Sequence, residues 1–462
     1  MKDRQNKEQH DFTRGPILGP LIRFAMPVLL ALFLQSMYGA VDLLIVGQFA
    51  APADISAVST GSQMMMTITN IIAGFSMGTT ILLGQQIGRG EQKKGGRTVG
   101  ASIYLFGAMG LAVMLVMILF AGKIAAIMQA PAEAFDATTA YLRICGGGAL
   151  IIIAYNLIGS IFRGIGDSAT PLITVAIACV VNIIGDLVLV AGLHMGTAGA
   201  AIATVAAQAI SVLISLALVR KKGLPFAFDR SMIRPDKALI GKVTMLGAPI
   251  AFSDLLVGIS FLVIQAIVNA LGVIPSAGIG VAERVCGFVM LVPSSFMQSL
   301  SAFVAQNIGA GKKDRAVRTL RIGIGLSLLA GLVMFYTAFF HGDMLAGIFS
   351  RSADVILAAA DYLKAYAIDC LLTAVFFCFV GFYNGLGMTR FVMLQGIVGA
   401  FLVRVPVSYL MSRQTPVSLF HIGLATPLSS LLQVILCLIC MAWVKKQWKK
   451  EEGKETEASQ SE

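Results

Sequence analysis

The sequence predicts an all-α polytopic membrane protein with twelve transmembrane helices, arranged as two six-helix repeats. Two observations lead to this fold class, namely composition and an internal duplication. The 462 residues are 57% hydrophobic and only 13% charged, whereas a soluble domain carries about 25% charged residues. Apolar stretches long enough to cross a bilayer, roughly 20 residues each, recur along the chain. The period-two alternation of a membrane β-barrel does not appear in the sequence.

The duplication is visible in short motifs that return about 221 positions later. The run Gln-Gln-Ile-Gly-Arg-Gly at 85–90 returns as Gln-Asn-Ile-Gly-Ala-Gly at 306–311. Arg-Gly-Ile-Gly at 163–166 returns as Asn-Gly-Leu-Gly at 384–387. An even number of spans in each half gives both halves the same orientation, so the repeats should be parallel, as in transporters that bind substrate between two repeats.

The apolar segments predict helices near 18–47, 53–85, 97–121, 133–161, 170–192, 197–220, 239–271, 276–307, 317–341, 354–384, 390–411 and 418–445. They divide the chain into a cytoplasmic tail (1–17), an N-terminal lobe (18–222), a linker (223–238), a C-terminal lobe (239–447) and a disordered acidic tail (448–462). Several segments exceed the roughly 20 residues needed to span, so tilts or kinks are expected. Pro27 and its counterpart Pro249 are the expected hinges, because proline removes a helical hydrogen bond.

Lysine and arginine predict the orientation. They gather in the even-numbered connections and after the last helix, whereas the opposite side carries Lys123, Arg351 and Arg413. Positively charged loops stay inside, so we expect a multi-pass protein of the bacterial cytoplasmic membrane with both termini in the cytoplasm. The net charge of +11 resides in these short loops and forms no basic face, so no nucleic-acid partner is expected.

Ionisable residues inside the first six helices are the first candidate site, because each costs roughly 2.5–3.5 kcal/mol to insert. Asn182 and Asp186 lie four residues apart, and so do Tyr38 and Asp42; each pair therefore shares a helix face. The full set proposed for cation coupling is Tyr38, Asp42, Asn156, Asn182, Asp186 and Thr204. Two carboxyl groups brought together could exchange a proton, or Asp42, Asp186 and Asn182 could hold Na⁺. Alternatively, these polar groups only join helices by hydrogen bonds.

The second half carries different charges, namely Asp254, Glu283, Arg284, Asp361, Asp369 and Arg404. Glu283 or Asp369 could pair with Arg284 or Arg404, or an unpaired acid could face a cavity and select cationic substrates. Adaptable methionine and aromatic side chains suit promiscuous binding. The expected substrate-cavity residues are Met64, Asp254, Glu283, Phe288, Met290 and Met297.

These residues resemble those of the multidrug and toxic compound extrusion (MATE) transporters. The resemblance rests on Ala-Met-Pro at 25–27, Tyr-Gly-Ala-Val-Asp at 38–42, the repeated Gln-x-Ile-Gly-x-Gly, Arg-Gly-Ile-Gly-Asp at 163–167 and Asn182-x-x-x-Asp186. It implies a V-shaped pair of lobes, alternating access and a coupling site in the N-terminal lobe, as in the bacterial DinF/MepA-like branch. A glutamate that another branch places in helix 7 is replaced here by Val257.

The expected function is export of cationic or amphipathic drugs in exchange for H⁺ or Na⁺. The nucleotide-binding Gly-x-x-x-x-Gly-Lys-Ser/Thr motif is missing from the sequence, and its cysteines lack metal-ligand spacing. We therefore expect a monomer in the lipid bilayer that has neither a cofactor nor an enzymatic activity. A flippase for lipid-linked glycans is the alternative, and it should place several arginines in the cavity.

Overall fold

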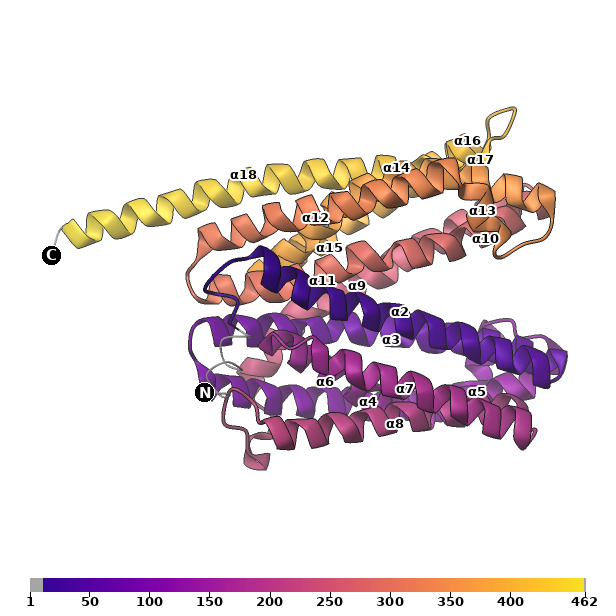
Figure 1. Cartoon of the computed structure of the whole chain (residues 1–462), viewed down its shortest axis with the longest axis horizontal. Coiled ribbons are helices and arrows are strands. Elements are labelled where there is room, and N and C mark those ends of the chain that lie inside the picture. The colour runs from indigo at the N-terminus through magenta and orange to yellow at the C-terminus, as the bar shows by residue number, and fades with distance from the viewer. Residues whose placement is uncertain (1–10, 461–462) are drawn as a thin grey trace. The chain divides into compact units, whose positions relative to one another are not determined.

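The computed structural model describes residues 11–460, except for the side chains of Gln92 and of residues 454–460. Over that range the secondary structure consists of helices (Figure 1). Eleven helices are long and apolar enough to span a membrane, and one further bent pair raises the total to twelve. The predicted all-α fold is therefore confirmed within the described residues.

The first half contains α2 (Leu18–Phe49), α3 (Pro52–Gly88), α4 (Gln92–Ile127), η1 (Ala132–Ala134), α5 (Phe135–Gly147), α6 (Ala149–Ile165), α7 (Ala169–Asp186), η2 (Leu187–Gly192) and α8 (Gly196–Lys222). The connection to the second half contains the short η3 (Arg230–Met232). The second half contains α9 (Lys237–Asn269), α10 (Val273–Val289), α11 (Leu291–Gly309), α12 (Lys313–Phe340), α13 (Gly342–Gly347), α14 (Ala353–Leu386), α15 (Thr389–Ile397), η4 (Val398–Arg404), α16 (Val405–Ser412), α17 (Leu419–Gly423) and α18 (Ala425–Gln460).

The helix predicted at 133–161 is bent by 53° between α5 and α6. The bend falls at the glycine run 146–148, where glycine lowers helix stability. A Cβ atom at Gly146 would collide with Met117, and one at Gly148 would collide with Val205. The glycines therefore also allow two neighbouring helices to approach closely.

The ends of the chain differ partly from the expectations. The predicted N-terminal tail lies outside the described residues up to position 10, and Phe12 beyond it is buried. The predicted disordered tail from 448 continues as helix α18 to Gln460. The reason lies in its composition, since glutamate, lysine, alanine and glutamine are strong helix formers. Residues 461 and 462 lie outside the described range.

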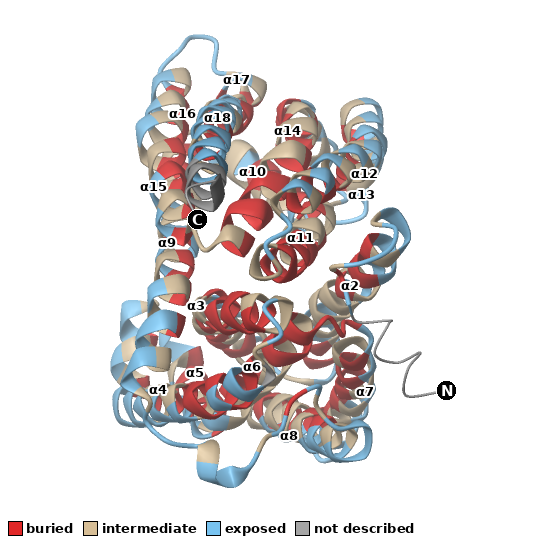
Figure 2. Ribbon diagram, turned by 90° about the vertical axis from the view of Figure 1, so that its left-hand side faces the viewer, coloured by how far each residue is buried: buried red, intermediate tan, exposed pale blue. Residues whose placement is uncertain are grey.

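Two compact units make up the chain. The first contains residues 1–255, 294–323 and 381–392, and the second contains 256–293, 324–380 and 393–462. In the first unit the buried residues concentrate on α3 and α6 (Figure 2). In the second unit a buried cluster joins α9, α10 and α14, with Ile264, Ile279 and Leu363 among its members. The two-lobe division of the sequence stays a prediction.

The repeated Gln-x-Ile-Gly-x-Gly motifs contact each other inside the first unit. The Gln85 side-chain amide donates to the Gly385 carbonyl at 3.0 Å, and the Gln306 amide donates to the Gly164 carbonyl at 3.3 Å. A Cβ atom at Gly88 would overlap the Gln306 carbonyl, while one at Gly309 would overlap the Gln85 carbonyl. Each motif therefore binds the other copy, which explains why the same residue types occur twice.

The positive-φ glycines follow the same repeat. Gly90 and Gly311 have φ of 73° and 72°, and Gly166 and Gly387 have φ of 88° and 83°. A left-handed residue ends a helix at low cost only when it is glycine. The duplication is therefore present in backbone conformation as well as in sequence.

Candidate functional site

Asp42 of α2 and Asp186 of α7 form the centre of the candidate site. They are 5% and 0% exposed, respectively, and their carboxyl groups lie within electrostatic range of each other. Among the described residues, Asp42 Oδ1 and both oxygens of Asp186 receive no hydrogen bond from a protein donor. Like charges in a poorly solvated site repel, so two carboxylates in this arrangement favour binding of a proton or a cation.

Asn182 lies one helical turn before Asp186 and is 1% exposed. Its side-chain oxygen and nitrogen both lack a hydrogen-bond partner within the described part of the chain. An unsatisfied buried amide costs free energy unless a ligand or water pairs with it. The three side chains predicted to hold Na⁺ thus present oxygen atoms of the kind that hard cations prefer.

Besides the predicted Tyr38, three residues that the sequence did not single out lie near the acid pair, namely Tyr141, Cys145 and Gln208. The Tyr38 hydroxyl adjoins the side chain of Gln208 on α8. Tyr141 and Cys145, one turn apart on α5, lie within electrostatic range of Asp42. Gln208 lies one turn after Thr204 in an apolar helix. Its position on the same helix face as Thr204 could have identified it as a site residue. Tyr141 and Cys145 could have been found only as polar groups four residues apart.

Two predicted coupling residues make other contacts. Asn156 donates its side-chain amide to the Ile152 carbonyl of its own helix at 2.9 Å and lines a pocket that also includes Gln35 and Tyr155. Thr204 donates its hydroxyl to the Ala200 carbonyl at 3.0 Å. Asp42, Asp186, Asn182 and Tyr38 therefore form the compact part of the predicted set.

A π-helix adjoins the ionisable residue of the fifth span in each half. In the first half η2 begins directly after Asp186, and in the second half η4 ends at Arg404. π-Helical turns are frequent at functional sites, because the extra residue disrupts the regular backbone hydrogen bonds. The sequence contains no pattern that predicts either segment.

In the second unit Asp369 of α14 lies within electrostatic range of Arg404. Both are buried, with exposures of 0% and 6%. The Arg404 guanidinium donates to the Ser260 hydroxyl at 3.3 Å and lies 4.6 Å from the Phe261 ring centroid. Of the pairings that the sequence left open, the structure supports that of Asp369 with Arg404, whereas Arg284 is exposed.

The predicted substrate-cavity residues fall in both units. Met64, Asp254 and Met297 belong to the first, and Glu283, Phe288 and Met290 belong to the second. Asp254 is exposed on α9 and adjoins Gly74 of α3. Met64 and Met290 pack on the cores of their own units, and the Phe288 ring stacks with Phe349 at 6.5 Å. Their common cavity stays a prediction.

Pro27 and Pro249 lie inside α2 and α9, as the sequence predicts. Each helix continues through its proline, and their role as hinges stays a prediction.

Comparison with known proteins identifies the family. The MatE family model matches residues 27–188 and again residues 249–410. The chain belongs to the MatE family. The two matches begin at Pro27 and Pro249, so the family model independently detects the duplication. The membership and the apolar helices together make the chain a multi-pass membrane protein.

Relatives of this MatE-family chain include the probable multidrug resistance protein YoeA of Bacillus subtilis, which is 25% identical over 92% of the chain and 94% of the relative. The multidrug export protein MepA of Staphylococcus aureus is 23% identical over 89% and 90%, respectively. A crystal structure of MATE in the straight conformation has a TM-score of 0.89 at 18% identity and covers 96% of this chain and 99% of its own. That likeness shows the fold.

Proposed function

We propose that the protein exports cationic or amphipathic small molecules in exchange for H⁺ or Na⁺. The observation that carries the proposal is the Asp42–Asp186 pair, which is buried without a protein hydrogen-bond donor to three of its oxygens. Such a pair binds a cation strongly only while the surrounding helices hold it closed. The names of the relatives, a multidrug export protein and a probable multidrug resistance protein, support drugs as the exported compounds.

The proposed coupling is a competition between the ion and the drug for two conformations of the protein. A proton or Na⁺ at Asp42 and Asp186 favours one conformation, and the drug favours the other, so each ligand lowers the affinity for its counterpart. The crossed Gln85–Gly385 and Gln306–Gly164 hydrogen bonds are the proposed gate of alternating access. Each bond joins the Gln-x-Ile-Gly-x-Gly motif of one repeat to the motif at 163–166 or 384–387 of the other, so their breakage would separate the two repeats at this point.

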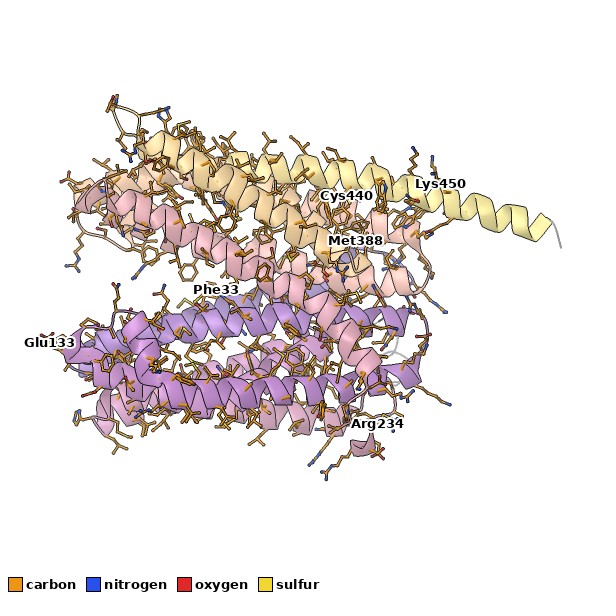
Figure 3. All side chains as sticks on the ribbon, turned by 180° about the vertical axis from the view of Figure 1, so that it is seen from behind. Phe33, Glu133, Arg234, Met388, Cys440 and Lys450 are labelled. Atoms are coloured by element: carbon orange, nitrogen blue, oxygen red, sulfur yellow. The ribbon has the colours of Figure 1, made fainter. Side chains whose placement is uncertain are left out.

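The membrane orientation is also part of the proposal. Glu133, between α4 and α5, and Arg234, between α8 and α9, lie at opposite ends of the first unit (Figure 3). Basic residues concentrate in the connections at the Arg234 end, including Arg89, Lys93 and Lys94. By the positive-inside rule this end faces the cytoplasm, with both termini on the same side of a bacterial cytoplasmic membrane.

The geometry favours drug export over lipid-linked glycan flipping. A flippase for an anionic headgroup needs several cavity arginines free of acidic partners. Of the two arginines inside the spans of the second half, Arg404 lies within electrostatic range of Asp369 and Arg284 is exposed.

The test is efflux of a fluorescent organic cation from proteoliposomes, with pH and Na⁺ gradients imposed separately. We expect one gradient to drive efflux, and Asp186→Asn to abolish the gradient-driven part. Gradient-driven efflux that survives both Asp42→Asn and Asp186→Asn would disprove the coupling site. The absence of efflux under either gradient would disprove drug export.

A further inference from the structure

Residues 11–16, which precede α2 and form what we call the N-terminal strap, bind the turn between α11 and α12 of the second repeat. Phe12 is 2% exposed. Its ring stacks on the Phe303 ring of α11 with the centroids 4.0 Å apart, and it meets the edge of the Phe24 ring of α2 at 5.2 Å. All three residues belong to the first unit. Aromatic pairs stabilise beyond the area that they bury, so Phe12 anchors the strap to α11.

Arg315 of α12 binds the main chain of the strap. Its guanidinium donates three hydrogen bonds of 2.8 to 3.0 Å to main-chain carbonyls, those of Phe12, Arg14 and Gly15. Gly15 has a φ of 70°, a conformation that glycine adopts at low cost, and this turn presents the carbonyls to one side chain. Hydrogen bonds from an ionised donor are roughly twice as strong as neutral ones. Arg315 is therefore the second anchor of the strap.

Gln306 connects the strap to the crossed contact between the repeats. It is 1% exposed. The Phe12 N–H donates to Gln306 Oε1 at 3.3 Å, while Gln306 Nε2 donates to the Gly164 carbonyl of the first repeat, also at 3.3 Å. An amide side chain has one oxygen acceptor and a separate NH₂ donor. By occupying the acceptor, the strap fixes the rotation of the amide that directs its NH₂ group to the first repeat.

The corresponding turn of the first repeat satisfies its basic residue locally. Under the 221-residue offset, Lys94 takes the place of Arg315, and it donates to Glu91 of its own turn at 2.7 Å. The counterpart of Glu91 is Lys312, whose ammonium donates to the Thr13 carbonyl of the strap at 2.8 Å. An acid of the first repeat is thus a base in the second, and both basic side chains of the α11–α12 turn bind the strap.

The linker before α9 packs on the first repeat in a similar way. Phe226 is 6% exposed, and a Cβ atom at Gly95 of α4 would collide with its ring. A Cβ atom at Gly100 of α4 would overlap the Met232 carbonyl. The segment that leads into each half therefore binds the third span of the other half. The linker joins helices at both of its ends, α8 and α9, whereas within the described residues the strap joins a helix only at α2. It can detach without moving a second helix.

From these contacts we infer that the N-terminal strap positions Gln306 and holds the two repeats together at this end of the first unit. The strap must leave the α11–α12 turn before the crossed contacts can open. Phe12 and Arg315 are the positioning residues, the first through its stacked ring and the second through its three hydrogen bonds. The inference rests on the proposed gate, and it adds the element that sets how readily the gate opens.

The test measures maleimide labelling of a cysteine introduced at the half-buried Ala310, whose backbone adjoins Gly88. Of the seven native cysteines, all within the described residues, only Cys440 is not buried, and it is first replaced by serine. The protein is purified full-length in detergent, with neither drug nor ion gradient. Phe12→Ala should speed labelling roughly 10-fold, as expected for the loss of a buried aromatic pair.

Arg315→Gln should speed labelling by a similar factor, because it leaves three strap carbonyls without their charged donor. Phe12→Leu, which keeps an apolar side chain but no ring, should give a smaller increase. The matched control is Lys94→Gln, at the counterpart of Arg315 in the first repeat, and it should leave labelling unchanged. Labelling of the native Cys145, which is buried in α5, is resolved in the same samples by mass spectrometry. It reports general unfolding and should not change.

An unchanged labelling rate at position 310 in either Phe12→Ala or Arg315→Gln would overturn the inference. Labelling of Cys145 that rises by the same factor would show that the strap only stabilises the fold, and it would overturn the inference as well. Because the measurement uses neither a drug nor a gradient, failure of the proposed drug export leaves its result readable.

Discussion

Asp42 and Asp186 in the first unit face each other as two acids, whereas Asp369 in the second unit has the base Arg404 within range. Both pairs are buried, and both include the fifth span of their half next to a π-helix. Asp369 and Arg404 carry opposite charges within electrostatic range of each other, so their charges can balance without an external ion. Two acids cannot do so. The comparison supports the proposal that an exchangeable cation binds in the first unit, and it predicts that the second pair acts on stability.

The largest expected effect follows from breaking the acid pair. Asp186→Asn removes a carboxylate that the cation needs, and we expect gradient-driven efflux to fall to the level of empty liposomes. Asp42→Asn should have the same effect, and the double variant should be no worse, because the two residues act as a unit. Asp136→Asn, at an exposed acid of α5, is the control. Additive losses would indicate that the two acids act separately.

Removal of Arg404 or Asp369 in the second unit should lower stability and leave transport coupling intact. Arg404→Leu leaves Asp369 buried without its base, and we expect a loss of about 3–5 kcal/mol in the free energy of unfolding. Adding Asp369→Leu should recover much of it, since a buried pair often tolerates replacement by apolar residues. Thermal unfolding in detergent measures the effect. If the double variant were as unstable as the single one but had lost coupling, Asp369 would belong to the transport site.

The crossed glycines test whether the two copies of the motif form a gate. Gly309→Ala would place a methyl group against the Gln85 carbonyl, and overpacking of this kind costs about 1–3 kcal/mol. We expect it to favour the separated state, seen as faster labelling of a cysteine introduced at the half-buried Ala310, whose backbone adjoins Gly88. Gly280→Ala, where a Cβ atom would meet nothing within 4 Å, is the control. Equal labelling in both variants would exclude the gate.

The smallest effect belongs to a solvent-exposed pair. The hydrogen bond from Lys94, at 2.7 Å, lowers the pKa of Glu91. A lowered pKa in the folded state contributes stability above the unfolded-state pKa, and the contribution is lost as the pH falls through the folded-state value. Glu91→Gln should therefore lower the melting temperature slightly at neutral pH and not at all in acid. A large drop in melting temperature at neutral pH would contradict the expectation that this exposed pair contributes less to stability than the buried pairs.

Part of the candidate site was predictable from residue type and spacing. Asp42 and Asp186 are costly in a membrane helix, and Asn182 shares a helix face with Asp186, so composition and period were sufficient to find them. Tyr141 was not singled out as a site residue, because it lies on a different helix from both acids. Only the packing places it within electrostatic range of Asp42.

The sequence by itself determined the class of fold, the duplication and the ionisable residues within the spanning helices. The length of the apolar segments, the repeated motifs and the free energy of inserting a charge are all properties of the chain alone. Tertiary structure decided which charges meet. Asp369 lies within electrostatic range of Arg404, whereas Arg284 is exposed, and the Asn156 side chain donates to the Ile152 carbonyl of its own helix. The same holds for Gln85 and Gln306, whose partners lie in the opposite repeat. These choices depend on helix rotation and on close approach at glycines, which no local pattern specifies.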